Sequence, residues 1–142
     1  MSSAENSSGT GPDQAPVILL VEDEILIRLS AAEFLRQHGY MVLEASDAEE
    51  ALVLFASDQA LDLVITDVRM PGELDGVKLT RIIKEARPDL PVALASGHLA
   101  FDAEHPGDRL LRKPYTPEEL LEVVDELIGP EWQSRQSNSK AS

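Results

Sequence analysis

The chain has 142 residues, enough for one compact domain, and its 43% hydrophobic and 27% charged residues are typical of a globular protein. It contains no cysteine, which excludes disulfides, cysteine-ligated zinc, iron–sulfur clusters and thiol catalysis, so any metal must be bound by oxygen or imidazole. The net charge of −14 repels phosphate backbones and anionic lipids, and we expect neither nucleic acid nor a membrane as a direct partner.

The two ends of the chain differ from its centre in composition. Residues 1–15 are rich in Ser, Gly and Pro and have no periodic apolar pattern, which predicts a disordered leader. Residues 130–142 are mostly polar and predict a flexible tail, so residues 16–129 form the folded domain. The leader lacks the cationic start and the apolar stretch of a secretory signal, and we therefore expect a cytoplasmic protein.

Between these ends, short apolar runs alternate with segments of helical periodicity, which indicates repeated β-α units and a mainly parallel sheet. Residues 17–21 form a continuous branched run of the kind found in a strand that is covered on both faces. The helix that follows stops at Gly39, a residue suited to a helix end. The apolar residues at helical spacing along this helix are Ile27, Ala31, Phe34 and Leu35.

The same alternation continues to the end of the domain. The four further strands are predicted at residues 40–44, 61–66, 91–95 and 109–112. A helix capped by Asp47 follows the second strand, and a helix over residues 76–86 follows the third. The last helix begins at Thr116, with a capping hydroxyl and a proline in its first turn, and it ends before Gly129.

Polar side chains stand at the ends of the predicted strands. Glu22 and Asp23 come after the first strand, Asp67 after the third, Ser96 after the fourth and Lys113 after the fifth. In a parallel α/β sheet, functional groups gather beyond the carboxyl ends of the strands. Three carboxylates, a hydroxyl and an ammonium are therefore predicted to converge at one edge of the sheet.

Clustered carboxylates repel one another unless a cation or a proton neutralises them. Ligands made only of oxygen, with room for water, favour magnesium. A magnesium ion and a lysine ammonium beside one carboxylate would neutralise an incoming phosphoryl group, which leaves that carboxylate as the nucleophile. The site thus suits phosphoryl transfer to an aspartate. Taken singly, Asp67 could instead be a helix cap, Ser96 a turn hydroxyl and Lys113 a solvated charge.

The ordered pattern Glu-Asp, Asp, Ser and Lys-Pro resembles the receiver domain of two-component response regulators. The resemblance covers about residues 15–129. It implies a doubly wound, flavodoxin-like α/β fold with a five-stranded parallel sheet in the order 2-1-3-4-5 and helices on both faces. It also implies a phosphoacceptor that assists its own phosphorylation and dephosphorylation, and not an enzyme that turns over a separate substrate.

The resemblance implies a set of Mg²⁺ ligands around the acceptor. Asp67 is the expected phosphoacceptor and also binds the metal. Asp23 is expected to bind the metal directly, and Glu22 binds it either directly or through water. The main-chain carbonyl of Arg69, two residues past the acceptor, supplies a further ligand.

The resemblance also implies the residues that meet the phosphoryl group. Ser96 is expected to hydrogen-bond this group and Lys113 to pair with it, and the peptide bond before Pro114 is expected to be cis. The loop after the acceptor matches the family at residues 70–72 and 75–76, which read Met-Pro-Gly and Asp-Gly.

Four positions depart from the commonest family pattern. The first acid is Glu22 where aspartate is most frequent, and the hydroxyl at Ser96 belongs to serine where threonine is frequent. The position three residues before the lysine, often a Tyr or Phe that switches rotamer, is Leu110. We expect His98, two residues after the serine, to lie over the site and to modulate the phosphoryl lifetime together with Arg69.

The segment before the last predicted strand leaves little room for a fourth helix. Pro106 and Gly107 favour a turn, so this helix spans at most roughly two turns, about residues 98–104. Its strong apolar residues, Leu99 and Phe101, are two positions apart and cannot share a helix face. We therefore predict that the fourth helix is short, irregular or mobile before phosphorylation.

These observations predict a single-domain response regulator that receives its phosphoryl group from a sensor histidine kinase or a histidine phosphotransfer protein. Its output is expected to be onward phosphotransfer, contact with a downstream protein, or action within a larger assembly. The alternative is an interaction module that keeps the fold and works without phosphorylation. A small-molecule phosphatase with an aspartate nucleophile fits less well, because such enzymes carry a second aspartate where this chain has Arg69.

Overall fold

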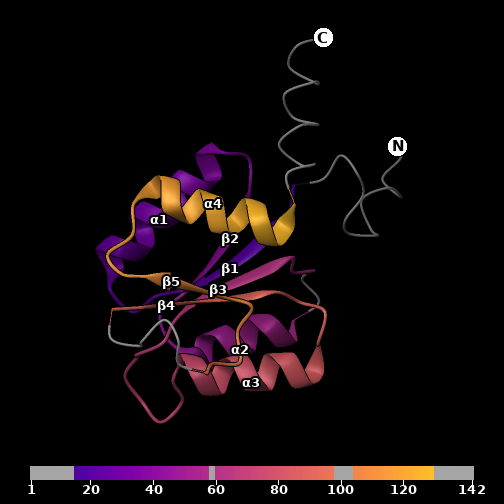
Figure 1. Ribbon diagram of the computed structural model, residues 1–142. Helices are drawn as coiled ribbons and strands as arrows, with labels where there is room; N and C mark the ends of the chain where they lie inside the picture. Colours follow the sequence, from indigo (N-terminus) through magenta and orange to yellow (C-terminus); the bar gives the residue numbers. More distant parts are fainter. Residues whose placement is uncertain (1–14, 58–59, 98–103, 130–142) are drawn as a thin grey trace.

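A computed structural model describes residues 15–57, 60–97 and 104–129. Five parallel strands form one sheet in the order β2-β1-β3-β4-β5, with β3 at its centre (Figure 1). The strands are β1 (Val17–Val21), β2 (Met41–Ala45), β3 (Leu63–Asp67), β4 (Val92–Ser96) and β5 (Arg109–Arg112). The predicted doubly wound, flavodoxin-like α/β fold is confirmed.

Two layers of helices enclose the sheet. The helices of the described residues are α1 (Ile25–Gln37), α2 (Ala48–Ala56), α3 (Gly76–Ala86) and α4 (Pro117–Ile128). Helices α1 and α4 cover one face of the sheet, and α2 and α3 cover the other (Figure 1). None of these helices is long and apolar enough to cross a membrane. The fourth helix predicted near residues 98–104 lies almost wholly outside the described residues.

The continuous apolar run of β1 is explained by these two layers. Ile18 and Leu20 pack into the core beneath α1 and α4, whereas Val17, Leu19 and Val21 pack into the core beneath α2 and α3. All five side chains are buried. Because successive residues of a strand point to opposite faces, a strand between two helical layers needs apolar residues at every position.

Three strands differ from the prediction by one or two residues at each end. The second strand begins at Met41, because the Tyr40 N–H donates to the Leu35 carbonyl at the end of α1. The third and fourth strands run one residue further than predicted and end on Asp67 and Ser96 themselves. Asp67 is paired with Ala95 in the parallel ladder. The two polar side chains are therefore held by the sheet and not by a loop.

The helices begin at residues that the sequence identified. Asp47 accepts a hydrogen bond from the Glu50 N–H at 2.8 Å, and Thr116 forms a full capping box with Glu119. Helix α1 differs, because its N-cap residue, Glu24, makes no side-chain capping bond.

Candidate functional site

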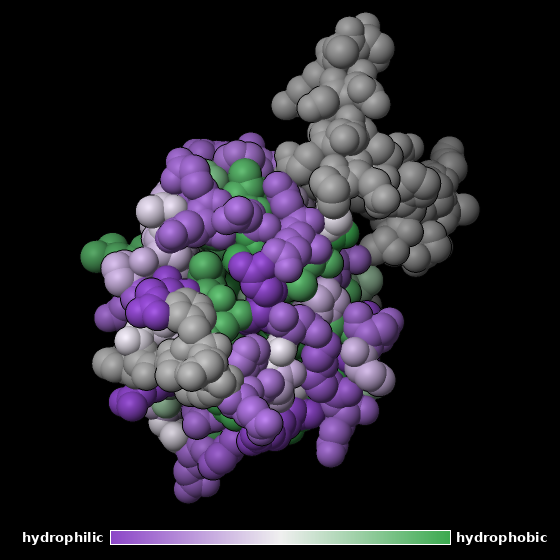
Figure 2. All heavy atoms as spheres, in the orientation of Figure 1, coloured by the Kyte–Doolittle hydropathy of each residue, from purple (hydrophilic) through white to green (hydrophobic). Residues whose placement is uncertain are grey.

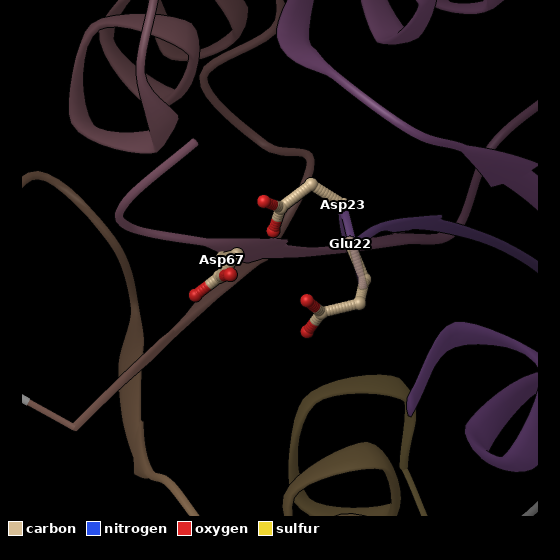
Figure 3. A group of neighbouring side chains, drawn as sticks. All are labelled: Glu22, Asp23 and Asp67. Atoms are coloured by element: carbon tan, nitrogen blue, oxygen red, sulfur yellow. The ribbon is translucent and has the colours of Figure 1, made fainter. Parts of the chain in front are cut away.

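Three carboxylates meet at the carboxyl end of the sheet. Glu22 and Asp23 directly follow β1, and Asp67 ends β3, the strand beside β1. One oxygen from each carboxylate lies within 4.8 Å of the others, and the side chains point into the same space (Figure 3). Glu22 and Asp67 are only 3% and 7% exposed, whereas Asp23 is exposed. The predicted acidic cluster is therefore assembled by the fold.

Lys113, which directly follows β5, provides the ammonium in contact with the cluster. Its Nζ lies 3.0 Å from Glu22 Oε1 and 3.2 Å from Asp67 Oδ2. The ammonium thus bridges the two buried carboxylates, and Asp23 lies on the more exposed side. One positive charge faces three carboxylates, so the ionised cluster keeps an excess of negative charge.

Burial and the neighbouring acids both affect the protonation of the cluster. Burial and the neighbouring Glu22 carboxylate raise the pKa of Asp67 to about 7, although Lys113 opposes the change. Burial lowers the pKa of the Lys113 ammonium, but its hydrogen bond to Glu22 and the charge of Asp67 outweigh this, so the pKa is raised overall. Lys113 therefore stays charged at neutral pH, while Asp67 holds a proton for part of the time.

The donor set fits a hard divalent cation. All three groups are carboxylates, one of them is exposed to water, and one oxygen of each lies within 4.8 Å of the others. Oxygen ligands with space for water are the preference of Mg²⁺. The described residues thus form an acidic pocket of the kind that binds Mg²⁺.

An open cleft of about 290 Å³ gives access to the cluster. Its lining residues are Asp23, Glu24, Asp67, Arg69, Ser96, Gly97 and Lys113. Ser96 is buried at the end of β4, and the Lys113–Pro114 peptide bond is cis. Glu22 is beneath the cleft and does not line it, because its carboxylate is turned toward Lys113.

Of the two residues predicted to modulate the site, the structure describes Leu110 but not His98. Leu110 lies half-buried in β5, paired with Leu94 of β4. Position 110 therefore has no aromatic ring that could switch rotamer. His98 lies outside the described residues, so its place over the site remains a prediction.

A close backbone approach fixes the loop that follows the acceptor. The Gly76 N–H donates to the Val68 carbonyl at 2.9 Å. A Cβ atom at position 76 would lie 1.9 Å from the main-chain oxygen of Asp67, a distance that no side chain tolerates. Glycine at this position is therefore a steric requirement of the site. The Asp-Gly motif was visible in the sequence, but its reason lies in this contact.

Two further residues contact or influence the cluster without having been predicted. Arg28 of α1 donates from Nη1 to the main-chain oxygen of Glu22 at 2.9 Å. Tyr115 lies close enough that burial and the Glu22 charge raise the pKa of its hydroxyl to about 12. Each of these residues has a signal in the sequence. Arg28 is a cation in the second turn after the acid pair, and Tyr115 is an aromatic residue two positions after the lysine.

Comparison with known proteins agrees with this geometry. Residues 18–125 match the response regulator receiver domain family. The chain is 38% identical over 116 residues to the response regulator MprA of Mycolicibacterium vanbaalenii, which covers 78% of this chain and 49% of MprA. It is 35% identical over 117 residues to the sensor kinase CckA of Brucella abortus, which covers 78% of this chain and 12% of CckA. The chain thus spans half or less of these relatives.

The fold has close counterparts among solved structures. The response regulator protein TrrA of Thermotoga maritima, solved in complex with Mg²⁺ and BeF, superposes with a TM-score of 0.71 at 31% identity, over 79% of this chain and 98% of TrrA. The family match extends from β1 into α4 and includes every residue of the acidic cluster. The chain therefore belongs to the response regulator receiver domain family of two-component signalling, whose members are phosphoacceptors and not enzymes of the usual kind.

Proposed function

We propose that this chain accepts a phosphoryl group on Asp67 from the phosphohistidine of a sensor kinase or a histidine phosphotransfer protein, and that it does so with Mg²⁺. The observation that carries the proposal is the convergence of three carboxylates and one ammonium at the open end of the sheet. Asp67 is the only one of the three carboxylates that both lines the cleft and contacts Lys113. It is thus the acid best placed to meet an incoming phosphoryl group.

In this proposal, each side chain of the cleft has a separate role in the transfer. A carboxylate oxygen of Asp67 attacks the phosphorus atom, the new P–O bond forms, and the P–N bond to the donor histidine breaks with its electron pair returning to the imidazole. Lys113 stays beside Asp67 and neutralises charge on the phosphoryl oxygens, and Ser96 donates a hydrogen bond to them. The sheet holds Asp67 and Ser96 in place, so alignment costs little reorganisation.

Asp23, Asp67, Glu22 and the main-chain carbonyl of Arg69 are the groups that would hold Mg²⁺ in this proposal. Bound Mg²⁺ supplies positive charge that offsets the developing charge on the phosphoryl oxygens. Of these residues, Asp23, Asp67 and Arg69 line the cleft. Glu22 faces Lys113, which favours its binding the metal through water over direct coordination. TrrA was solved in complex with Mg²⁺ and BeF, which supports Mg²⁺ binding in this family and is consistent with a metal at the acidic cluster.

The decisive experiment is phosphoryl transfer from autophosphorylated kinases, timed in the presence of Mg²⁺. The expected product carries one phosphoryl group, sensitive to hydroxylamine as an acyl phosphate is, and mapped to Asp67. The Asp67→Asn variant keeps the shape of the side chain and is expected to lose all stable incorporation. Incorporation equal to that of the wild type in this variant would contradict the assignment of the acceptor.

The alternative function, an interaction module that works without phosphorylation, predicts a different response to a phosphoryl analogue. A functional acceptor site binds beryllofluoride together with Mg²⁺, because the analogue occupies the place of the phosphoryl group. Calorimetric titration of the wild type against Asp67→Asn distinguishes the two. Binding by the wild type alone supports the acceptor, and absence of binding by both supports the interaction module.

The donor protein is expected to approach over the first turns of α1. Ile25, Leu26 and Leu29 are large aliphatic residues of α1 that are 57%, 79% and 47% exposed. The first of them directly follows Glu24, which lines the cleft. Most of the face seen in Figure 2 is hydrophilic, and hydrophobic side chains show only in small areas. Leu26→Asp is expected to slow transfer from a protein donor while transfer from acetyl phosphate stays unchanged. Equal slowing of both reactions would contradict this docking face.

A further inference from the structure

Arg28 makes two directional contacts from a half-buried position on α1, beside the acidic cluster. Its Nη1 donates to the main-chain oxygen of Glu22 at 2.9 Å, and its Nε donates to Glu44 Oε1 on β2 at 3.2 Å. The side chain of Arg28 is only 15% exposed. A planar guanidinium with two fixed contacts has little freedom to rotate, so it holds both partners in one arrangement.

The oxygen that Arg28 holds belongs to the peptide group that joins the two neighbouring acids. In a planar peptide, the carbonyl oxygen of Glu22 and the N–H and Cα of Asp23 lie in one plane. Fixing this oxygen therefore fixes the direction in which the chain leaves toward Asp23. The other polar group of the Glu22 backbone is also held, because its N–H donates to the Ala45 carbonyl at 3.0 Å. Asp23 itself is exposed and gains no such restraint from burial.

Arg28 reaches the acidic pair through the main chain, because its contact with Glu22 is to the carbonyl oxygen and not to the carboxylate. Glu44 is shared with a second arginine, Arg36, whose Nη1 lies 3.1 Å from Glu44 Oε2. Arg36 makes its other contact with the Val42 carbonyl on β2, at 2.8 Å. It is 47% exposed and does not contact Glu22 or Asp23 in any described interaction. Glu44 thus pairs with two arginines. One of them, Arg28, also contacts the acidic pair, at the main-chain oxygen of Glu22.

We propose that Arg28 is a positioning residue of the phosphoacceptor site, which orients the Glu22–Asp23 peptide so that Asp23 presents its carboxylate to Mg²⁺. The proposal rests on the proposed function for its metal, but the orientation of the peptide is a property of the chain alone. Groups that orient a metal ligand commonly change metal affinity by about 10- to 100-fold when they are lost. We expect a loss at the lower end of this range, because Arg28 acts through the main chain of its neighbour.

The test compares Arg28→Met with Arg36→Met in two measurements. Calorimetric titration with Mg²⁺ is expected to show about a tenfold loss of affinity for Arg28→Met and less than about a twofold loss for Arg36→Met. In the metal-free protein, the NMR amide signal of Asp23 is expected to shift in Arg28→Met and to stay in place in Arg36→Met. At saturating Mg²⁺, the rate of phosphorylation of Arg28→Met by acetyl phosphate is expected to return close to that of the wild type.

Equal Mg²⁺ affinities and equal Asp23 amide signals in the two variants would overturn the proposal. A rate of Arg28→Met that stays low at saturating Mg²⁺ also overturns it, because Arg28 would then act on the chemistry and not on metal binding. If Arg28→Met does not fold, Arg28→Lys and Arg36→Lys decide the matter by the same two readouts, since lysine keeps the charge but not the two-pronged contact. A wild type without Mg²⁺ affinity refutes the proposed function, and the Asp23 amide comparison still decides the role of Arg28.

Discussion

Acidic residues lie at both ends of the sheet, and their surroundings differ. At the amino end, Asp62 Oδ2 accepts from the Val17 N–H and Asp108 Oδ2 accepts from the Val92 N–H, each at 2.8 Å. Asp108 also pairs with Lys84 at 2.7 Å. Each of these acids has its own donor. At the carboxyl end, three acids meet a single ammonium, that of Lys113.

The direction of the strands explains this difference. Parallel strands begin with main-chain N–H groups that have no partner in the ladder, and a carboxylate placed there satisfies them. The carboxyl ends of the strands offer carbonyl oxygens, which do not stabilise a carboxylate. Acids at the amino end therefore stabilise the fold, whereas acids at the carboxyl end hold an excess of negative charge that a bound cation would offset.

Replacing the lysine at each end of the sheet by alanine is expected to give the largest difference in stability. Lys113→Ala leaves Glu22 and Asp67 buried without their shared cation, and we expect the metal-free protein to lose about 2–3 kcal/mol of stability. Mg²⁺ is expected to restore most of this loss, because it supplies the missing charge. Lys84→Ala is expected to cost about 1 kcal/mol or less, with no dependence on Mg²⁺. Urea unfolding of both variants, with Mg²⁺ and with EDTA, measures this difference in stability. An equal effect of Mg²⁺ on the two variants would contradict the prediction.

Neutralising one acid at each end tests the contrast through metal binding. Asp23→Asn removes the charge of a carboxylate that lines the cleft and that we propose as a ligand, and we expect the affinity for Mg²⁺ to fall by about 10- to 100-fold. Asp62→Asn, at the opposite end, is expected to bind Mg²⁺ like the wild type. Calorimetric titration measures both. Unchanged affinity in Asp23→Asn would show that this residue is not a ligand.

The role of acids at the amino end is tested by stability. Asp108→Ala removes the acceptor of the Val92 N–H and the partner of Lys84, and we expect a loss of about 1–2 kcal/mol. Acetyl phosphate is expected to phosphorylate this variant at the wild-type rate, once the protein is folded. Chemical unfolding and an incorporation assay check the two statements. A slower incorporation would mean that the two ends of the sheet are coupled.

Much of the fold follows from local patterns in the sequence. The uninterrupted branched run at 17–21 predicts a strand buried on both faces, and the capping residues Asp47 and Thr116 mark helix starts that the structure confirms. The ends of β3 and β4 could not be located in this way. Asp67 and Ser96 are polar and read as residues after a strand, but pairing with neighbouring strands extends the ladder through them.

The convergence of the polar side chains could be predicted from the sequence, but their individual contacts could not. The order of strand ends places Glu22, Asp67 and Lys113 at one edge, and the structure brings them into contact. That Lys113 bridges two carboxylates, and that Gly76 must lie against the Asp67 backbone, depends on how loops cross in space. A sequence pattern contains no such distances, so the contacts of Arg28 were missed for the same reason.

The last prediction concerns the pH dependence of stability, which the buried acid at the carboxyl end should produce. Burial and Glu22 raise the pKa of Asp67 to about 7 in the folded protein, whereas an unfolded aspartate titrates near pH 4. Between these values the folded state binds more protons than the unfolded state, so this group destabilises the protein as pH rises from about 4 to 7. The cleft is open to water, and we therefore expect a modest loss of about 1–2 kcal/mol. Urea unfolding in EDTA at both ends of this range is expected to show the loss in the wild type and not in Asp67→Asn. Identical pH dependence in the two proteins would show that the acids of the carboxyl end are as well compensated as Asp62 and Asp108.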